Sequence, residues 1–334
     1  MEDLRYLTDF YDEKIKKIND LDAPVNFIFI TDMHHKLNKF AIEAGLSKMT
    51  SWEDGVKHIR SMQYIIDRVK GVQFVICGGD IGCDYNTDPL EVKNIHHEIV
   101  DALYSLSVPV HCVTGNHDDA LGDATDRKCD NTLAAFPPEE LHKLYMKNNP
   151  TDKNYYYMDL ADTDYRFVFL DVNDKPYHKL PNGQYPYGWR VEFSNEQADW
   201  FEKEALATDK NVIVVCHCPI RNNGIIGSGD APSYIRSYDD VLNAPRVYSA
   251  IKSSKNVLCI LAGHVHFDNF VYDDGLPVIT TLCSYVQEWC NLCPKREVGT
   301  ITETAFDVVS IKDNKIYLTR FGAGEDREGV LPVK

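Results

Sequence analysis

The chain has no long apolar run and is short of positive charge. None of its 334 residues belongs to a stretch near the roughly 18 apolar residues that a membrane span needs. Residues 1–22 are charged throughout and contain no apolar signal-peptide core. Lys and Arg number 35 against 51 Asp and Glu, and binding to nucleic acid or an anionic membrane needs clustered positive charge. We therefore expect a cytoplasmic protein with no membrane partner, for which nucleic acid is an unfavourable ligand.

The ten cysteines do not form the pattern of a disulfide framework. Several lie inside apolar runs, among them Cys77, Cys112 and Cys216, in a chain too large to need covalent staples. We expect free thiols. The pair Cys290 and Cys293 forms one CxxC without a second pair at zinc-finger spacing, so we do not expect a structural zinc site there.

Apolar runs alternate with amphipathic stretches in the first half of the chain. The runs at residues 25–31, 73–77 and 109–114 are separated by helix-like segments near 52–69 and 91–106. This alternation is typical of an α/β fold with parallel strands. Short alternating segments after residue 270 predict further strands, and the polar tail 322–334 is expected to end the fold.

Five of the predicted strands end in residue types that can bind metal ions. Carboxyl ends of parallel strands meet at one edge of a sheet. Side chains also alternate faces along extended chain, so residues two apart are expected to point the same way. The strand ends are Asp32-x-His34, Gly79-Asp80, Gly115-Asn116-His117-Asp118, His217 and Gly263-His264-x-His266. Imidazole combined with carboxylate and amide oxygen suits zinc, manganese or iron better than calcium or copper(I).

The order of these motifs resembles the calcineurin-like metallophosphoesterase superfamily, whose pattern is D-x-H, G-D, G-N-H-[DE], H and G-H-x-H. The resemblance implies an α/β fold of two packed mixed β-sheets flanked by helices, a four-layer sandwich. Because the sequence has no internal repeat, low-complexity segment or linker, we expect one domain over residues 1–334. Within it, residues 1–24 would form an N-terminal helical extension, and residues 267–334 would supply strands that complete the sheets.

The resemblance further implies a dinuclear metal centre of two divalent or mixed-valence ions of manganese, iron or zinc. A hydroxide that bridges the ions would attack phosphorus in line, and His117 would protonate the leaving oxygen as general acid. Asp80 would bridge the two ions. The implied ligands of one ion are Asp32, His34, Asp80 and His266, and those of the other are Asp80, Asn116, His217 and His264.

Residues near the motifs narrow the branch of the family. The position three after Asp80 is Cys83, where purple acid phosphatases have a tyrosine, so an iron(III)-tyrosinate site is not expected. In some branches a carboxylate three residues after the bridging aspartate supports the histidine that corresponds to His117. Here Asp84 stands one position later, so this pairing is not expected. The arginines of protein Ser/Thr phosphatases are missing, which favours the single-domain bacterial phosphodiesterase and phosphatase branch. Arg221 is the first candidate for a phosphate contact, with a solvated surface residue as the alternative.

The function predicted is hydrolysis of a small phosphate ester, and the motifs leave phosphodiesters and phosphomonoesters open. A non-catalytic scaffold with the same fold is an alternative, although no ligand is missing. A nuclease is another, and it would need a local positive track for the strand. Substrate choice is assigned to the loops 173–190 and 220–240. His96 and His97, which belong to no motif, are expected at the surface.

Overall fold

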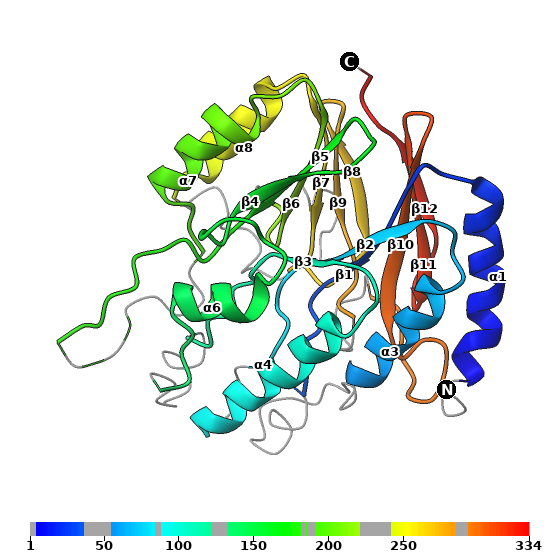
Figure 1. Ribbon diagram of the computed structural model, residues 1–334, viewed down its shortest axis with the longest axis horizontal. Helices are drawn as coiled ribbons and strands as arrows, with labels where there is room; N and C mark the ends of the chain where they lie inside the picture. Colours follow the sequence, from blue (N-terminus) through cyan, green and yellow to red (C-terminus); the bar gives the residue numbers. More distant parts are fainter. Residues whose placement is uncertain are drawn as a thin grey trace.

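Two six-stranded β-sheets pack face to face and carry helices on their outer sides (Figure 1). The computed structural model describes residues 5–36, 55–83, 88–121, 133–181, 183, 185, 191–220, 242–284 and 293–333. Within these ranges, no helix combines the length and apolar character needed to cross a bilayer. The predicted fold class is confirmed, because both sheets are mixed and both are flanked by helices.

The first sheet has the strand order β12-β11-β10-β1-β2-β3. Strands β1, β2 and β3 run parallel, and the other three join them through antiparallel pairs. The parallel half is therefore built from the N-terminal part of the chain and the antiparallel half from its end. The bounds are β1 Val25–Ile30, β2 Val72–Cys77, β3 Val110–Cys112, β10 Ala305–Lys312, β11 Lys315–Gly322 and β12 Arg327–Val330.

The second sheet has the order β4-β5-β6-β7-β9-β8. Its four central strands are parallel, and β4 and β8 pair antiparallel at the two edges. The bounds are β4 Tyr156–Asp159, β5 Tyr165–Leu170, β6 Asn211–Cys216, β7 Val257–Ala262, β8 Asn269–Asp273 and β9 Leu276–Thr280.

The helices divide between the outer faces of the two sheets. In Figure 1, α1 lies beside β11 and β12, whereas α7 and α8 lie together beside the second sheet. Ser194 caps α7, since its hydroxyl accepts from Gln197 N at 3.0 Å. The helix bounds are α1 Arg5–Leu21, α3 Gly55–Ile66, α4 Pro89–Tyr104, α6 Pro138–Tyr145, α7 Asn195–Trp200 with a π-helical turn at Phe201–Ala205, and α8 Ala244–Ser253.

The period-two pattern of the strands explains the layers. In β6, Ile213 belongs to the core between the sheets, and the next residue, Val214, packs in the core under α7 and α8. Aromatic rings fill the space between the sheets. Phe27 stacks on Phe74 at 5.1 Å between ring centroids, and both meet the edge of Phe167 from the second sheet. The two sheets thus form a continuous core that fixes their relative position.

Two expectations from the sequence are wrong. The polar tail does not simply end the fold, because Arg327–Val330 forms the edge strand β12. The sequence of this strand is largely polar and therefore does not predict a strand, since an edge strand with one solvated face needs few apolar residues. His96 is buried, not exposed as His97 is, and its ring nitrogen hydrogen-bonds the hydroxyl of Tyr145. Because His96 is buried against a polar group, the hydrophobic pattern of the helix does not mark this position as buried.

The cysteines agree with the sequence prediction as far as they are described. All eight described cysteines are free thiols, and seven of them are buried. Cys290 lies outside the described residues, while Cys293 is half-buried and its thiol donates to the carbonyl of His266 at 3.2 Å.

Candidate metal centre

The motif residues gather where the parallel strands of both sheets end. Asp32 and His34 follow β1, Asp80 follows β2, and Asn116 follows β3 in the first sheet. In the second sheet, His217 follows β6, and His264 and His266 follow β7. Because the sheets pack together, five separate segments of the chain meet at one place.

The loops after β1 and β2 are held to each other by backbone hydrogen bonds. Asp32 N donates to Gly79 O and His34 N donates to Asp80 O, both at 2.9 Å. The backbone is no longer extended here, since φ is 52° at Asp32, 41° at His34 and 52° at Asp80. Non-glycine residues in this left-handed region cost about 1–3 kcal/mol each and cluster at functional sites. The side chains of Asp32 and His34 do converge, but through this turn and not through strand alternation.

Two glycines allow the loops of the first sheet to approach closely. Gly79 has φ of 92°, and a Cβ atom there would lie 2.6 Å from Gly115 N and 2.8 Å from His217 Nδ1. A Cβ atom on Gly115 would lie 2.1 Å from Asp80 Oδ1. Any side chain at either position would push the carboxylate or the imidazole out of place.

The first cluster of possible ligands contains Asp32, His34, Asp80 and His266. One ligand atom from each lies within 4.8 Å of all the others, and three of the four residues are buried. His34 Nε2 is 3.1 Å from His266 Nε2 and 3.6 Å from Asp80 Oδ2. His266 Nε2 is 3.1 Å from Asp32 Oδ1. Ligand atoms around one ion with bonds near 2.1 Å lie about 3 Å apart, so this spacing fits a metal ion.

The second cluster is centred on His217. Its Nε2 lies 3.1 Å from Asp80 Oδ2 and 3.2 Å from His264 Nδ1. Its Nδ1 lies 2.7 Å from Gly78 O, which orients the ring and leaves Nε2 toward the cluster. The sulfur of Cys218 also lies within 4.8 Å of ligand atoms of His217 and His264. Sequence reasoning missed this thiol, although its position directly after His217 was a usable signal.

Asn116 tests whether the site suits a cation. It is 4% exposed, and its buried Oδ1 accepts no hydrogen bond from any residue that the structure describes. A buried polar atom that lacks a partner is costly unless something else satisfies it. Together with the imidazoles and carboxylates, this oxygen makes a donor set suited to a first-row transition metal.

Electrostatics keep two of the imidazoles neutral and one charged. Burial lowers the pKa of His34 to about 4 and that of His264 to about 3. Neutral rings have a nitrogen lone pair free for a metal. Burial also acts to lower the pKa of His217, but the facing carboxylates of Asp80 and Asp32 outweigh it and raise the pKa to about 9.

The two carboxylates at the centre are ionised despite their burial. Burial acts to raise the pKa of Asp32, yet the facing His266 and His217 hold it at about 2. Burial also acts to raise the pKa of Asp80, but His217 and then His117 lower it by more. The pKa of Asp80 therefore lies well below its usual range. Two buried carboxylates side by side carry the negative charge that a bound cation would neutralise.

His117 lies beside the clusters and not within them. Its ring centroid is 5.1 Å from that of His34, and it is more exposed than the neighbouring Asn116 and Asp118. Its backbone N–H donates to Asp80 Oδ1 at 2.9 Å, which ties its loop to the central carboxylate.

Asp118 does not orient His117, its neighbour in the sequence, but bonds the backbone of two turns. Its carboxylate accepts backbone hydrogen bonds from Asp80 N at 2.9 Å, Ile81 N at 2.7 Å and Gly115 N at 2.7 Å. Burial, followed by the nearby Asp80 charge, raises its pKa to about 7. Asp118 therefore fastens the turn after β2 to the turn after β3.

Sequence reasoning also missed a link between the His117 loop and the loop after β5. Lys175 Nζ lies 2.6 Å from Asp119 Oδ2 with both side chains fully buried. Asn173 Nδ2 donates to Gly115 O at 2.6 Å. These contacts join residues that are far apart in the sequence. The only local signal for them is the adjacent pair of acidic residues Asp118 and Asp119. Asp84, Arg221 and residues 221–241 lie outside the described residues, as does part of the loop 173–190.

The fold has relatives among solved structures. A dimetal phosphatase from Danio rerio is 18% identical, with 93% of this chain and 100% of that chain covered and a TM-score of 0.61. GAP50, the anchor in the inner membrane complex of Plasmodium, is 16% identical, with 94% and 90% covered and a TM-score of 0.49. Among curated protein sequences there is no match.

The sequence profile of one family matches residues 25–268, which is most of the chain and includes all five motifs. The family is described as calcineurin-like phosphoesterase. The match agrees with the two-sheet fold and with the ligand clusters at the strand ends. The chain belongs to the calcineurin-like phosphoesterase family, and the resemblance inferred from its motifs is confirmed.

Proposed function

We propose that the protein hydrolyses a small phosphate ester with two transition-metal ions, and that Asp80 is their shared ligand. The observation that carries the proposal is the position of Asp80 Oδ2, 3.6 Å from His34 Nε2 in one cluster and 3.1 Å from His217 Nε2 in the other. A buried carboxylate that faces imidazoles on two sides suits a bridge between two ions. The proposed ligands are Asp32, His34, Asp80 and His266 for one ion, and Asp80, Asn116, His217 and His264 for the other.

The chain's own residues would orient the centre and move a proton. Bound ions would supply positive charge for the phosphate oxygens and an activated water for attack on phosphorus. His117 is the candidate general acid, because it lies beside His34 without joining either cluster and is not fully buried. A substrate oxygen that leaves toward His117 would receive the proton from its ring. The bond from His117 N to Asp80 keeps that ring at a set distance from the metal ligands.

Manganese, iron and zinc are the metals that this donor set favours. Each proposed ion has imidazole nitrogen and carboxylate oxygen, and one also has the amide oxygen of Asn116. Calcium takes oxygen ligands only, and copper(I) prefers thiolate and thioether. The negative balance of the chain does not oppose a phosphate ester, since the bound cations would supply the local positive field.

Substitution of His117 tests the chemical role. His117→Ala should retain wild-type metal content but lose about 10²–10⁴-fold in kcat on phenyl phosphate esters, whose leaving group needs a proton. The loss on p-nitrophenyl esters should be much smaller, because p-nitrophenolate leaves without help. The matched control is His97→Ala, which removes an exposed histidine away from the centre.

The same assay separates substrate classes. Wild-type protein loaded with manganese would be compared on bis(p-nitrophenyl) phosphate and p-nitrophenyl phosphate, and the faster ester identifies a phosphodiesterase or a phosphatase. Inactivity on both esters, with two ions bound per chain, would overturn the hydrolase. Loss of metal in His117→Ala would overturn the general-acid assignment.

A further inference from the structure

The loop that carries His264 and His266 has a backbone that must be held in place. Both residues lie in the left-handed region, with φ of 67° and 61°. Non-glycine residues keep this conformation only where the surroundings enforce it. The two histidines point at different clusters, so a small rotation of the loop would move ligands of both.

The loop is anchored at its two ends by different groups. At its start, His264 N donates to both carboxylate oxygens of Asp32, at 3.0 and 2.9 Å. At its end, Phe267 O accepts from the hydroxyl of Thr280 at 3.0 Å, and Asp268 Oδ1 accepts from Leu282 N at 3.2 Å. Asp268 is thus the last fixed point, two residues beyond His266.

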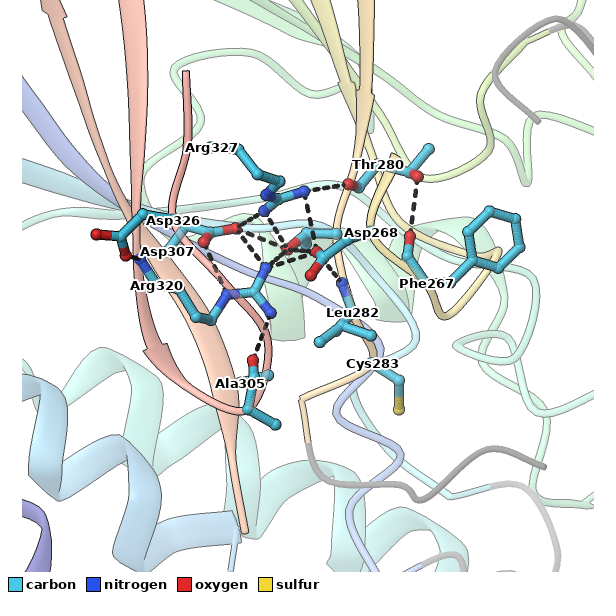
Figure 2. A network of polar contacts seen from close by, with 12 residues as sticks. Phe267, Asp268, Thr280, Leu282, Cys283, Ala305, Asp307, Arg320, Asp326 and Arg327 are labelled. Atoms are coloured by element: carbon cyan, nitrogen blue, oxygen red, sulfur yellow. Dashed lines mark hydrogen bonds and ion pairs between the residues drawn. The ribbon is translucent and has the colours of Figure 1, made fainter. Parts of the chain in front are cut away.

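Two arginines hold Asp268 (Figure 2). Arg320 Nη2 lies 2.6 Å and Arg327 Nη1 lies 2.9 Å from Asp268 Oδ1. Both arginines also pair with Asp307, through Arg320 Nε at 2.9 Å and Arg327 Nη2 at 2.5 Å. The cluster balances two positive with two negative charges. Arg320 is 1% exposed and Asp307 is fully buried, so each charge depends on its partners.

The arginines come from outside the region that matches the family. Arg320 lies on β11 and Arg327 on β12, both after residue 268, where the match ends. Arg327 reaches further, since its Nη1 donates at 2.7 Å to the carbonyl of Thr280, whose hydroxyl holds Phe267. The last strands of the first sheet are therefore connected to the metal loop of the second sheet.

We propose that Asp268, clamped by Arg320 and Arg327, is a positioning residue that keeps His266 in place to bind its metal ion. The proposal rests on the metal centre of the proposed function. Partners that orient metal ligands typically contribute 10–100-fold to metal affinity. A purely structural cluster would lower stability when broken and leave that affinity unchanged.

The variants are Arg327→Met, Asp268→Asn and their combination. Arg327 is chosen over Arg320 because its side chain is 13% exposed, whereas that of Arg320 is 1% exposed and also donates to Ala323 O. The matched control is Arg166→Met. Arg166 is also largely buried, with 9% of its side chain exposed, and it pairs with Asp159 in the second sheet, on the strand pair β4 and β5.

The measurement is metal bound per chain against free manganese in a metal buffer, together with the melting temperature of the metal-free protein. Arg327→Met and Asp268→Asn should each raise the dissociation constant of one ion about tenfold. The double variant should add little, because the two side chains act through one contact. Arg166→Met should lower the melting temperature and leave both dissociation constants unchanged.

Two results would overturn the positioning role. One is wild-type metal affinity in both single variants. The other is an equal loss of affinity in Arg166→Met. A wild-type protein that binds two ions but hydrolyses no ester overturns the hydrolase alone, because the affinity comparison still decides the role of Asp268. A wild-type protein that binds no transition metal overturns both.

Discussion

The metal-site loops of the two sheets are held in different ways. In the first sheet, the loops after β1 and β2 continue the bonding of their parallel strands, so that Asp32 N and His34 N donate to backbone carbonyls. In the second sheet, the loop after β7 starts with one such backbone bond, from Gly263 N to His217 O. Its later residues are held by side chains, with His264 N on the carboxylate of Asp32 and Asp268 on two arginines. The bonds between the loops after β1 and β2 join neighbouring strands of one sheet, whereas the arginine contacts join the second sheet to residues far along the chain.

This difference predicts where substitutions matter. Backbone hydrogen bonds do not depend on which side chain is present, so most neighbours of the first-sheet loops should tolerate change. The exceptions are Gly79 and Gly115, where any side chain would displace a neighbour, and Asp118, whose carboxylate accepts from three backbone N–H groups. In the second sheet, the sensitive positions are the charged side chains around Asp268.

The largest effect is expected where the two arrangements meet, at Asp80. Asp80→Ala removes the carboxylate between both clusters and the acceptor of His117 N. We expect metal affinity to fall by more than about 100-fold, beyond the range of partners that only orient ligands, and phosphoesterase activity to be lost. Asp80→Asn should lose less, since it keeps an oxygen for His117 N. Full metal content in Asp80→Ala, measured by elemental analysis, would contradict the shared-ligand assignment.

A smaller effect is expected from Asp118→Asn, the first-sheet counterpart of Arg327→Met. One amide oxygen cannot replace two carboxylate oxygens, and the NH₂ group would face a backbone N–H. Leaving one buried donor without a partner costs about 1–3 kcal/mol, so the free energy of unfolding of the metal-free protein should fall by that amount in a denaturant titration. An unchanged unfolding free energy would mean that the loops do not depend on this carboxylate.

The sequence predicts the fold class and the segments that meet at the centre, because apolar runs and their polar ends are local signals. It predicts the convergence of Asp32 and His34 for the wrong reason. The expectation was based on strand alternation, whereas in the structure Asp32 and His34 have left-handed backbone conformations. No local sequence pattern predicts these conformations. The role of Asp118 depends on which way its side chain turns, which is set by neighbouring loops.

Long-range partners are the part that the sequence does not reveal. Arg320 and Arg327 stand in a segment without a recognisable motif, and their partner Asp268 is more than 50 positions away. Ion pairs of this kind form only once the two sheets are assembled. The buried ion pair between Lys175 and Asp119 could not be predicted from the sequence for the same reason.

The smallest effect concerns the charge of His217, where the two sheets influence each other. His217 belongs to the second sheet, but Asp80 and Asp32 of the first raise its pKa to about 9. In the metal-free protein, an NMR titration should therefore show the His217 ring losing its proton near pH 9. The rings of His34 and His264, with pKa values of about 4 and 3, should stay neutral from pH 6 upward.

The sign of the stability change follows from that raised pKa. The pKa of His217 is about 9 in the folded protein, against about 6.5 for a histidine in the unfolded chain. The protonated ring therefore contributes its full stabilisation below about pH 6.5, and this stabilisation is lost as the pH rises through about 9. Metal-free protein should thus unfold more easily at pH 9.5 than at pH 6.5. Asp80→Asn should weaken this pH dependence by removing the first carboxylate that faces the ring. A His217 midpoint near 6.5 in the wild type would show that the carboxylates of the first sheet do not act on the second.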